Sequence, residues 1–139
     1  MKAIYYILQG TWGLPMNVIG ILVYAFFRFV GFEAKRHGGC FFIPLGKCWG
    51  GFSLGMFFFC DRRETEYIKN HEFGHSLQNC FLGALMIPLT ILSIARYHYR
   101  NLITKRGTPC NTPYDSFWFE GQATRLGNKY IQKFKKGDD

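Results

Sequence analysis

Residues 71–75 read H-E-F-G-H, an H-E-x-x-H motif that requires this part of the chain to be helical if it is to bind a metal. Residues four apart lie on one face of an α-helix, so His71 and His75 can bind the same Zn²⁺. Glu72 then points toward the open coordination position, where a general base must lie. The motif therefore predicts a helix on which His71 and His75 are zinc ligands and Glu72 is the catalytic residue.

The residues on either side of the motif extend this helix. Asp61 is expected at its N-cap, with Glu64 as the reciprocal capping partner at N3. After the motif comes an apolar run of 16 residues, 80–95, which has Pro88 near its middle and is short for a straight crossing of a bilayer. We therefore expect residues 62–97 to form the metal helix and to continue into a re-entrant or interfacial apolar segment.

A longer apolar run occupies residues 12–32, about 20 residues, which is close to the length that a bilayer crossing needs. No small-residue cleavage site follows it, so we expect an uncleaved transmembrane anchor. Of the 17 Lys and Arg residues, only Lys2 precedes this run. The positive-inside bias then places the rest of the chain, including the zinc site, on the cytoplasmic side of the cytoplasmic membrane.

The composition agrees with a membrane protein of one domain, residues 1–139. Fifteen phenylalanines are more than so small a soluble fold needs for its core, and a net charge of +8 favours an anionic membrane surface. No segment resembles a nucleic-acid-binding module, so the lipid bilayer is the expected partner. Five cysteines without a C-x-x-C pair indicate reduced thiols rather than a disulfide framework.

Residues 40–60 differ in character from the helical segments. Two aromatic runs, 40–45 and 52–59, are bounded by glycines and are typical of β-strands, and the glycine-rich residues 46–51 between them indicate a turn. Pro44 cannot donate to a sheet ladder, so the first strand is expected at an edge. The predicted fold class is a mainly α membrane protein with a small β-hairpin.

A catalytic zinc site needs a third protein ligand, and four downstream residues can supply it: His98, Cys110, Asp115 and Glu120. Cys110 lies in a turn-rich loop, and Asp115 is well placed to cap a last helix over residues 115–135. His98 reaches the motif only if Pro88 folds the apolar helix back. Glu120 lies on the last helix, which can hold a carboxylate rigidly, so it is the preferred ligand. The run 80–95 then cannot cross the bilayer, because no later apolar segment would bring Glu120 back.

The two helices together resemble a known family. Their motifs, H-E-x-G-H and E-x-x-A-T-R starting at Glu120, resemble those of the membrane-embedded gluzincins, the CAAX prenyl endopeptidases and related heat-shock membrane proteases. The first motif, with Gln78, is also similar to small uncharacterised membrane proteins that carry H-E-x-G-H-x-x-Q. The resemblance covers about a third of the chain and implies a minimal zincin-like helix pair with Glu120 as the third ligand. Thr124 departs from the family, which has at this position an aspartate that supports the metal site.

These observations predict a membrane-anchored zinc metallopeptidase that acts on a peptide or protein substrate. The oxyanion donor is left open among Arg125, Tyr130, Tyr114 and His98, and Gln78 is expected either to orient a ligand or to bind substrate. Two alternatives remain: a non-catalytic membrane protein whose zinc ties two helices together, and a metal-free protein that binds membranes or partners.

Overall fold

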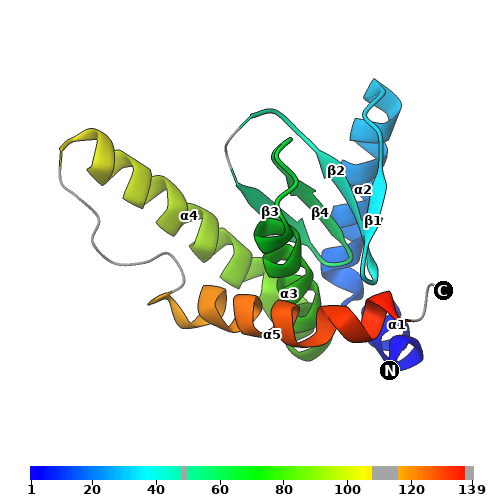
Figure 1. Cartoon of the computed structure of the whole chain (residues 1–139). Coiled ribbons are helices and arrows are strands. Elements are labelled where there is room, and N and C mark those ends of the chain that lie inside the picture. Colours follow the sequence, from blue (N-terminus) through cyan, green and yellow to red (C-terminus); the bar gives the residue numbers. More distant parts are fainter. Residues whose placement is uncertain (48–49, 108–115, 137–139) are drawn as a thin grey trace.

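The computed structural model describes residues 1–47, 50–107 and 116–136. In this part of the chain helices dominate, and a four-stranded sheet lies among them (Figure 1). The helices are α1 (Lys2–Gly10), α2 (Leu14–Val30), α3 (Glu66–Leu82), α4 (Met86–Lys105) and α5 (Trp118–Lys135), with a short 3₁₀ turn, η1 (Gly83–Leu85), between α3 and α4. The mainly helical class with a small β element is therefore confirmed.

The sheet corrects the hairpin that we expected over residues 40–60. β1 (Lys35–His37) pairs antiparallel with β2 (Cys40–Pro44), β2 pairs parallel with β4 (Phe57–Cys60), and β4 pairs antiparallel with β3 (Gly51–Leu54). The strand order is thus β1-β2-β4-β3, and the two aromatic runs do not form one hairpin. The second run is itself a hairpin, because Gly55 at φ 70° allows a tight turn in its middle.

Pro44 does not mark an edge strand, since β2 lies between β1 and β4. The backbone N–H groups of Phe41 and Leu45 donate toward β4, to Met56 O and Cys60 O. Alternation along the strand places the missing N–H of Pro44 on the β1 side. There the pairing of β1 ends at Phe42, so Pro44 deprives no ladder partner of a donor.

Successive residues of the strands pack on opposite faces of the sheet and fill two cores. Phe42, Phe58 and Cys60 pack with residues of α1, α3 and the C-terminal half of α5, whereas Ile43 and Phe59 pack with residues of α2, the beginning of α4 and the first turn of α5. The sheet therefore separates α2 from the pair α3 and α5 (Figure 1). Several phenylalanines that suggested a lipid-facing surface are in fact core residues.

The N-terminal apolar run is bent rather than straight. α1 and α2 meet at an angle of 87°, and the helix within residues 12–32 covers only Leu14–Val30. Buried amides hold this elbow: Gln9 Nε2 donates to Ser76 O on α3 at 2.8 Å, and Asn17 Nδ2 donates to Gln9 O at 2.7 Å. Asn17 Oδ1 also accepts from the backbone N–H of Met56 at 2.6 Å. Asn17, which interrupts the apolar run, is thus a structural residue that ties α2 to α1 and to the β3–β4 turn.

The metal helix begins later than the capping residues predicted. α3 starts at Glu66, and Thr65 Oγ1 accepts the N–H of Ile68 as its N-cap. Asp61 is buried and instead accepts from the N–H groups of Gly50 and Arg63, and its pKa is lowered mainly by hydrogen bonds from the Arg63 side chain. Asp61 therefore closes the loop after β4 and is not a helix cap.

The helix after the metal motif turns back at η1, not at Pro88. Gly83 adopts φ 55°, where a side chain would be strained, and α4 does not continue the axis of α3 (Figure 1). Pro88 lies in the first turn of α4, where the helix has no backbone acceptor for its missing N–H. Within the described residues the stretch Glu66–Lys105 is long and apolar enough to cross a membrane, and α1 with α2 qualifies only as a bent pair.

The C-terminal helix begins at Trp118, with Phe117 at its N-cap position, and Asp115, the expected cap, lies outside the described residues. Gly127 lies where α5 crosses α3, and a Cβ there would overlap the carbonyl of Asn70. Gly74 of α3 makes the same kind of contact with the carbonyl of Ala123. Two glycines, Gly74 and Gly127, thus let the helices that carry the predicted ligands approach closely.

Candidate metal centre

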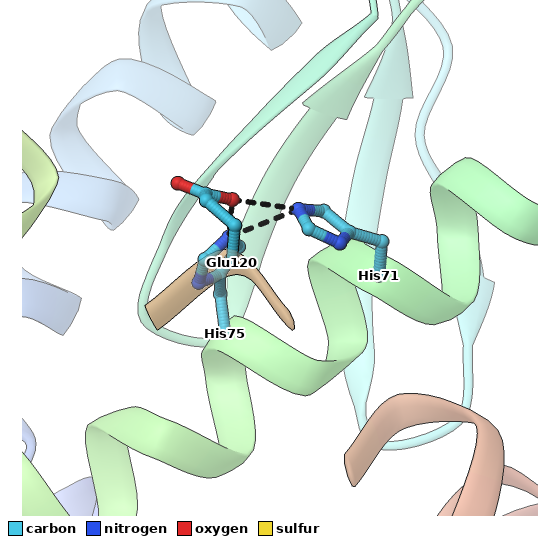
Figure 2. A group of neighbouring side chains, drawn as sticks. All are labelled: His71, His75 and Glu120. Atoms are coloured by element: carbon cyan, nitrogen blue, oxygen red, sulfur yellow. Dashed lines mark hydrogen bonds and ion pairs between the residues drawn. The ribbon is translucent and has the colours of Figure 1, made fainter. Parts of the chain in front are cut away.

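Three buried side chains converge where α3 crosses α5. Nε2 of His71 lies 3.0 Å and Nε2 of His75 lies 3.1 Å from Oε2 of Glu120, and the two imidazole nitrogens are 3.2 Å apart (Figure 2). His71 and His75 lie one turn apart on α3, and Glu120 lies in the first turn of α5, where the helix dipole favours a carboxylate. These three residues form a group that can hold a metal ion.

The outer nitrogen of His75 is held by an amide whose orientation is fixed. Gln78 Nε2 donates to the backbone carbonyl of Phe119 at 2.8 Å, so Gln78 Oε1 must face His75 Nδ1, 2.7 Å away. An amide oxygen only accepts, so His75 carries its proton on Nδ1. In the neutral imidazole, Nε2 then carries the lone pair that can bind a metal.

The outer nitrogen of His71 has an equivalent partner on α5. Thr124 Oγ1 donates to the backbone carbonyl of Glu120 at 3.3 Å and lies 2.8 Å from His71 Nδ1. Because the hydroxyl proton is used toward the carbonyl, Thr124 accepts from His71 Nδ1–H. Thr124 stands where the resembled family has aspartate, and it supports the histidine with a neutral hydroxyl instead of a charge.

When both imidazoles are neutral, these hydrogen bonds leave the Nε2 lone pairs of His71 and His75 facing Oε2 of Glu120 within a buried space. The ligand atoms all lie within 4.8 Å of one another. Without a cation, only protonation of an imidazole could relieve their mutual repulsion, and a metal ion would replace that proton. The donor set of two imidazoles and one carboxylate therefore fits a divalent metal with a preference for nitrogen and oxygen ligands.

Burial opposes the ionisation of Glu120, but its hydrogen bonds with His71 and His75 outweigh this and lower its pKa to about 2. Its second oxygen, Oε1, accepts a hydrogen bond from Ser93 Oγ on α4. Glu120 thus presents Oε2 to the metal position while Ser93 holds the other oxygen. Ser93 connects the metal centre to α4, a contact that no motif in the sequence indicated.

Replacing Ser93 by Ala is expected to weaken metal binding about 10–100-fold, the usual cost of removing a partner of a metal ligand. Glu120 would lose the hydrogen bond that fixes its Oε1, and the buried oxygen would be left without that donor. Competition with a chromophoric chelator measures this affinity. Ser93→Thr keeps the hydroxyl and is expected to stay close to wild type. Equal affinity of the Ala variant and wild type would show that Glu120 needs no support from α4.

Glu72 lies beside this group but is not part of it. Its side chain is 3% exposed, and burial raises its pKa from 4.5 to about 8. Glu72 Oε2 has no hydrogen-bond partner among the described residues. A buried carboxyl group with an unused oxygen and a pKa near neutrality has the properties of a general base.

A cleft of about 600 Å³ opens over the three ligands and Glu72. On one side it is lined by β3, which is the edge strand next to β4, and on the other by α4. The residues that β3 contributes are Gly51, Phe52 and Ser53, and α4 contributes mainly Ser93, Ile94, Tyr97, His98 and Asn101. His71, His75 and Glu120 are therefore reached from a cleft that has an apolar lining and the edge strand β3 along one side.

The other predicted site residues are distributed unequally around this cleft. His98 lines it but is not among the metal-holding group, and Gln78 orients His75 instead of facing the cleft. Neither Arg125, which is exposed, nor Tyr130, which packs beside Lys129 and Lys133, lines the cleft. Tyr114 and Cys110 lie outside the described residues.

Two aromatic residues of the cleft were missed from the sequence. Tyr67 lies one turn before His71 on α3 and stacks on its ring, with centroids 6.2 Å apart. Tyr97 lines the opposite wall on α4. The i, i+4 spacing of Tyr67 and His71 was a usable signal for the first, whereas Tyr97 reaches the site only because η1 folds α4 back.

Comparison of the chain with protein-family models, with curated proteins and with solved structures finds no match.

Proposed function

We propose that this protein is a zinc metallopeptidase attached to a membrane, of the gluzincin type that its motifs resemble. The observation that carries the proposal is the buried convergence of His71, His75 and Glu120 beside an unpaired carboxyl group, Glu72, at the bottom of an open cleft. A metal that serves only to tie helices together needs neither the carboxyl group nor the cleft. Both are required when water must attack a bound substrate.

His71, His75 and Glu120 would hold the metal, with Gln78 and Thr124 fixing the imidazoles in the required tautomer. Bound zinc acts as a Lewis acid and lowers the pKa of a coordinated water toward about 7. Glu72 takes the proton from the attacking water at its free oxygen and returns it to the leaving amine. The oxyanion donor is proposed to come from the cleft, where His98 is the one candidate of the original four that lines it among the described residues.

The substrate of this reaction is proposed to bind as an extended peptide along β3. This strand lies at the edge of the sheet and lines the cleft over the metal group. An added strand there would use backbone hydrogen bonds that are independent of side-chain identity. The apolar lining, which includes Phe52, Ile94 and Phe119, favours peptides with large apolar side chains near the cleaved bond.

We further propose that the metal centre acts on the cytoplasmic side of the cytoplasmic membrane. Large apolar side chains are exposed on α2 and α4, which supports contact with lipid. Fifteen of the 17 Lys and Arg residues follow the first apolar run, and anionic lipids of the cytoplasmic leaflet attract such a surface.

Stoichiometric zinc in the purified protein is the first expected result. Elemental analysis should find about one zinc per chain in wild type and very little in His71→Ala, because two protein ligands retain zinc poorly. His98→Ala is the matched control: it removes a histidine that lines the same cleft but is not in the metal-holding group, and it should retain the metal. Wild-type protein without zinc, even after incubation with the ion, would refute the peptidase and the structural-zinc alternative together.

A further inference from the structure

The outer face of α2 is apolar along its whole length. Leu22 is 67%, Phe26 61% and Phe29 92% exposed, and Arg28 is the only charged residue of the helix. The face, called the α2 face below, consists of Leu14, Val18, Ile19, Ile21, Leu22, Phe26, Phe29 and Val30. Continuous apolar exposure of this kind on a soluble surface marks an interaction site.

The apolar surface continues around the elbow between α1 and α2. Trp12 Nε1 donates to the backbone carbonyl of Phe81, 3.0 Å away, at the end of α3. Trp12, Phe81 and Leu85 are all more than half exposed, so the α2 face extends through the elbow to η1. Tryptophan is typical of the boundary between hydrocarbon and headgroups.

The inner face of α2 is fixed to the sheet, so the helix cannot leave the body of the protein. Gly20 allows α2 to approach the Leu54 carbonyl, and the ring of Phe27 lies 5.4 Å from that of Phe59. If α2 crossed a bilayer, the sheet would be carried into the hydrocarbon with it. β3 is an edge strand, and unpaired backbone groups of an edge are not tolerated there.

Charged residues lie shortly after α2 and on α5, a helix that packs against α1. Lys35 and Arg36 are exposed in β1, shortly after its C-terminal end. Beyond the elbow at the other end, the ring of Tyr5 in α1 packs 5.1 Å from Phe134 of α5, a helix whose last turn carries Lys133 and Lys135.

The 17 residues of α2 span roughly 25 Å, less than the roughly 30 Å of a hydrocarbon core. The helix α2 is therefore too short to cross the hydrocarbon core, and a crossing would also place the edge strand β3 in lipid.

We propose that α2 lies in the plane of the membrane, with the α2 face and Trp12 in a single leaflet, and that the chain does not cross the bilayer at α1 and α2. The occupant of the face is lipid rather than a second copy of this chain, because a net charge of +8 repels a copy and attracts anionic headgroups. This inference rests on the proposed membrane attachment and is independent of peptidase activity.

Flotation with lipid vesicles tests the surface. Full-length protein is mixed with vesicles of phosphatidylcholine and phosphatidylglycerol, and Leu22→Glu is compared with Lys129→Gln. Each substitution lowers the net charge by one, but Lys129 is an exposed residue of α5, which packs on the other side of the sheet. Burial of the α2 face predicts at least about tenfold weaker binding for Leu22→Glu alone. Equal weakening of both variants, or no binding by wild type, would overturn the proposal.

The position of the chain ends tests the absence of a crossing. Epitope tags before Met1 and after Asp139 are exposed to protease in sealed membrane vesicles. An in-plane α2, together with a metal helix that folds back, predicts that both tags are digested from the same side. Digestion from opposite sides would establish a crossing and overturn the proposal.

Two further measurements distinguish lipid binding by the α2 face from damage to the metal centre and from self-association. Zinc content reports whether the variants keep the metal centre, and Leu22→Glu should retain the zinc of wild type because the α2 face lies outside the cleft. Light scattering without lipid reports association. A dimer that Leu22→Glu dissociates, with no vesicle binding by wild type, would assign the α2 face to a second copy and overturn the proposal.

Discussion

Glu72→Gln is expected to bind zinc as wild type does and to hydrolyse peptides about 10²–10⁴-fold more slowly, the usual contribution of a general base. Glutamine has the shape of glutamate but cannot take a proton from water at neutral pH. Glu72 is not one of the three residues that converge on the metal position, so its replacement leaves the ligand set intact. The variant therefore separates catalysis from metal binding.

Hydrolysis can be measured without a known substrate, using fluorescein-labelled casein and a mixed peptide library analysed by mass spectrometry. Zinc content of the same samples shows that both proteins are loaded. If neither zinc-loaded wild type nor the Gln variant cleaves a substrate in either assay, the structural-zinc alternative gains support. Cleavage that continues unchanged in the variant would point to a contaminating protease.

The same variant has a stability signature in metal-free protein. The pKa of Glu72 is raised to about 8 by burial, so the carboxyl group is mostly protonated in the folded metal-free protein at neutral pH, whereas it is ionised in the unfolded chain. Glu72 therefore destabilises the fold increasingly as the pH rises from about 4.5 to about 8. Metal-free Glu72→Gln is expected to unfold at a higher denaturant concentration than wild type at pH 7, and the difference should shrink toward pH 5.

The metal helix and its glutamate partner were predictable because each signal is local. A helix fixes the geometry of His71 and His75 whatever surrounds it, and a carboxylate on a second helix was the natural third ligand. Glu120 does lie with the two histidines. The features around them were not local. Ser93 reaches Glu120 only through the turn at η1, and Thr124 supports His71 across two helices.

The sheet was mispredicted for a physical reason. In the runs C-F-F-I-P and F-F-F-C nearly every residue is apolar, so no alternation shows which neighbour a strand pairs with. β2 and β4 are buried on both faces and pair in parallel, which a hairpin cannot provide. The glycine that divides residues 52–59 was the available signal, since Gly55-Met56 separates two short strands.

The predictions of the helix cap and of the straight membrane anchor failed for a different reason, because residues distant in the sequence supply the decisive hydrogen bonds. Asp61 and Glu64 satisfy a capping-box pattern, yet Asp61 is engaged by Gly50 and Arg63, and Thr65 supplies the cap. Asp61 does not cap the helix because its carboxylate accepts hydrogen bonds from Gly50 and Arg63 instead. In the N-terminal part of the chain, the buried hydrogen bonds of Gln9 to Asn17 and to Ser76 hold the bend between α1 and α2, and no local sequence pattern indicates these bonds.

Gly74→Ala is expected to be among the most destabilising single-methyl changes in the described part of the chain. Alanine is favoured over glycine inside a helix by about 1 kcal/mol, so an isolated α3 would gain from it. In the folded protein the new Cβ overlaps the carbonyl of Ala123, a backbone atom that no rotamer change can move away. Separating α3 from α5 costs more than the gain in propensity, with a net loss of about 2–3 kcal/mol.

Thermal unfolding should show this as a decrease in Tm of roughly 5–10 °C. Zinc affinity should fall in the same variant, because α5 carries Glu120 and Thr124 and must approach α3 closely for both to reach the histidines. Gly10→Ala is the matched control: a Cβ there meets nothing within 4 Å, so its Tm should equal or exceed that of wild type. If Gly74→Ala is as stable as Gly10→Ala and keeps its zinc, then α5 does not cross α3 at Gly74. The close approach of the two helices at Gly74 would then not be what brings Glu120 to the histidines.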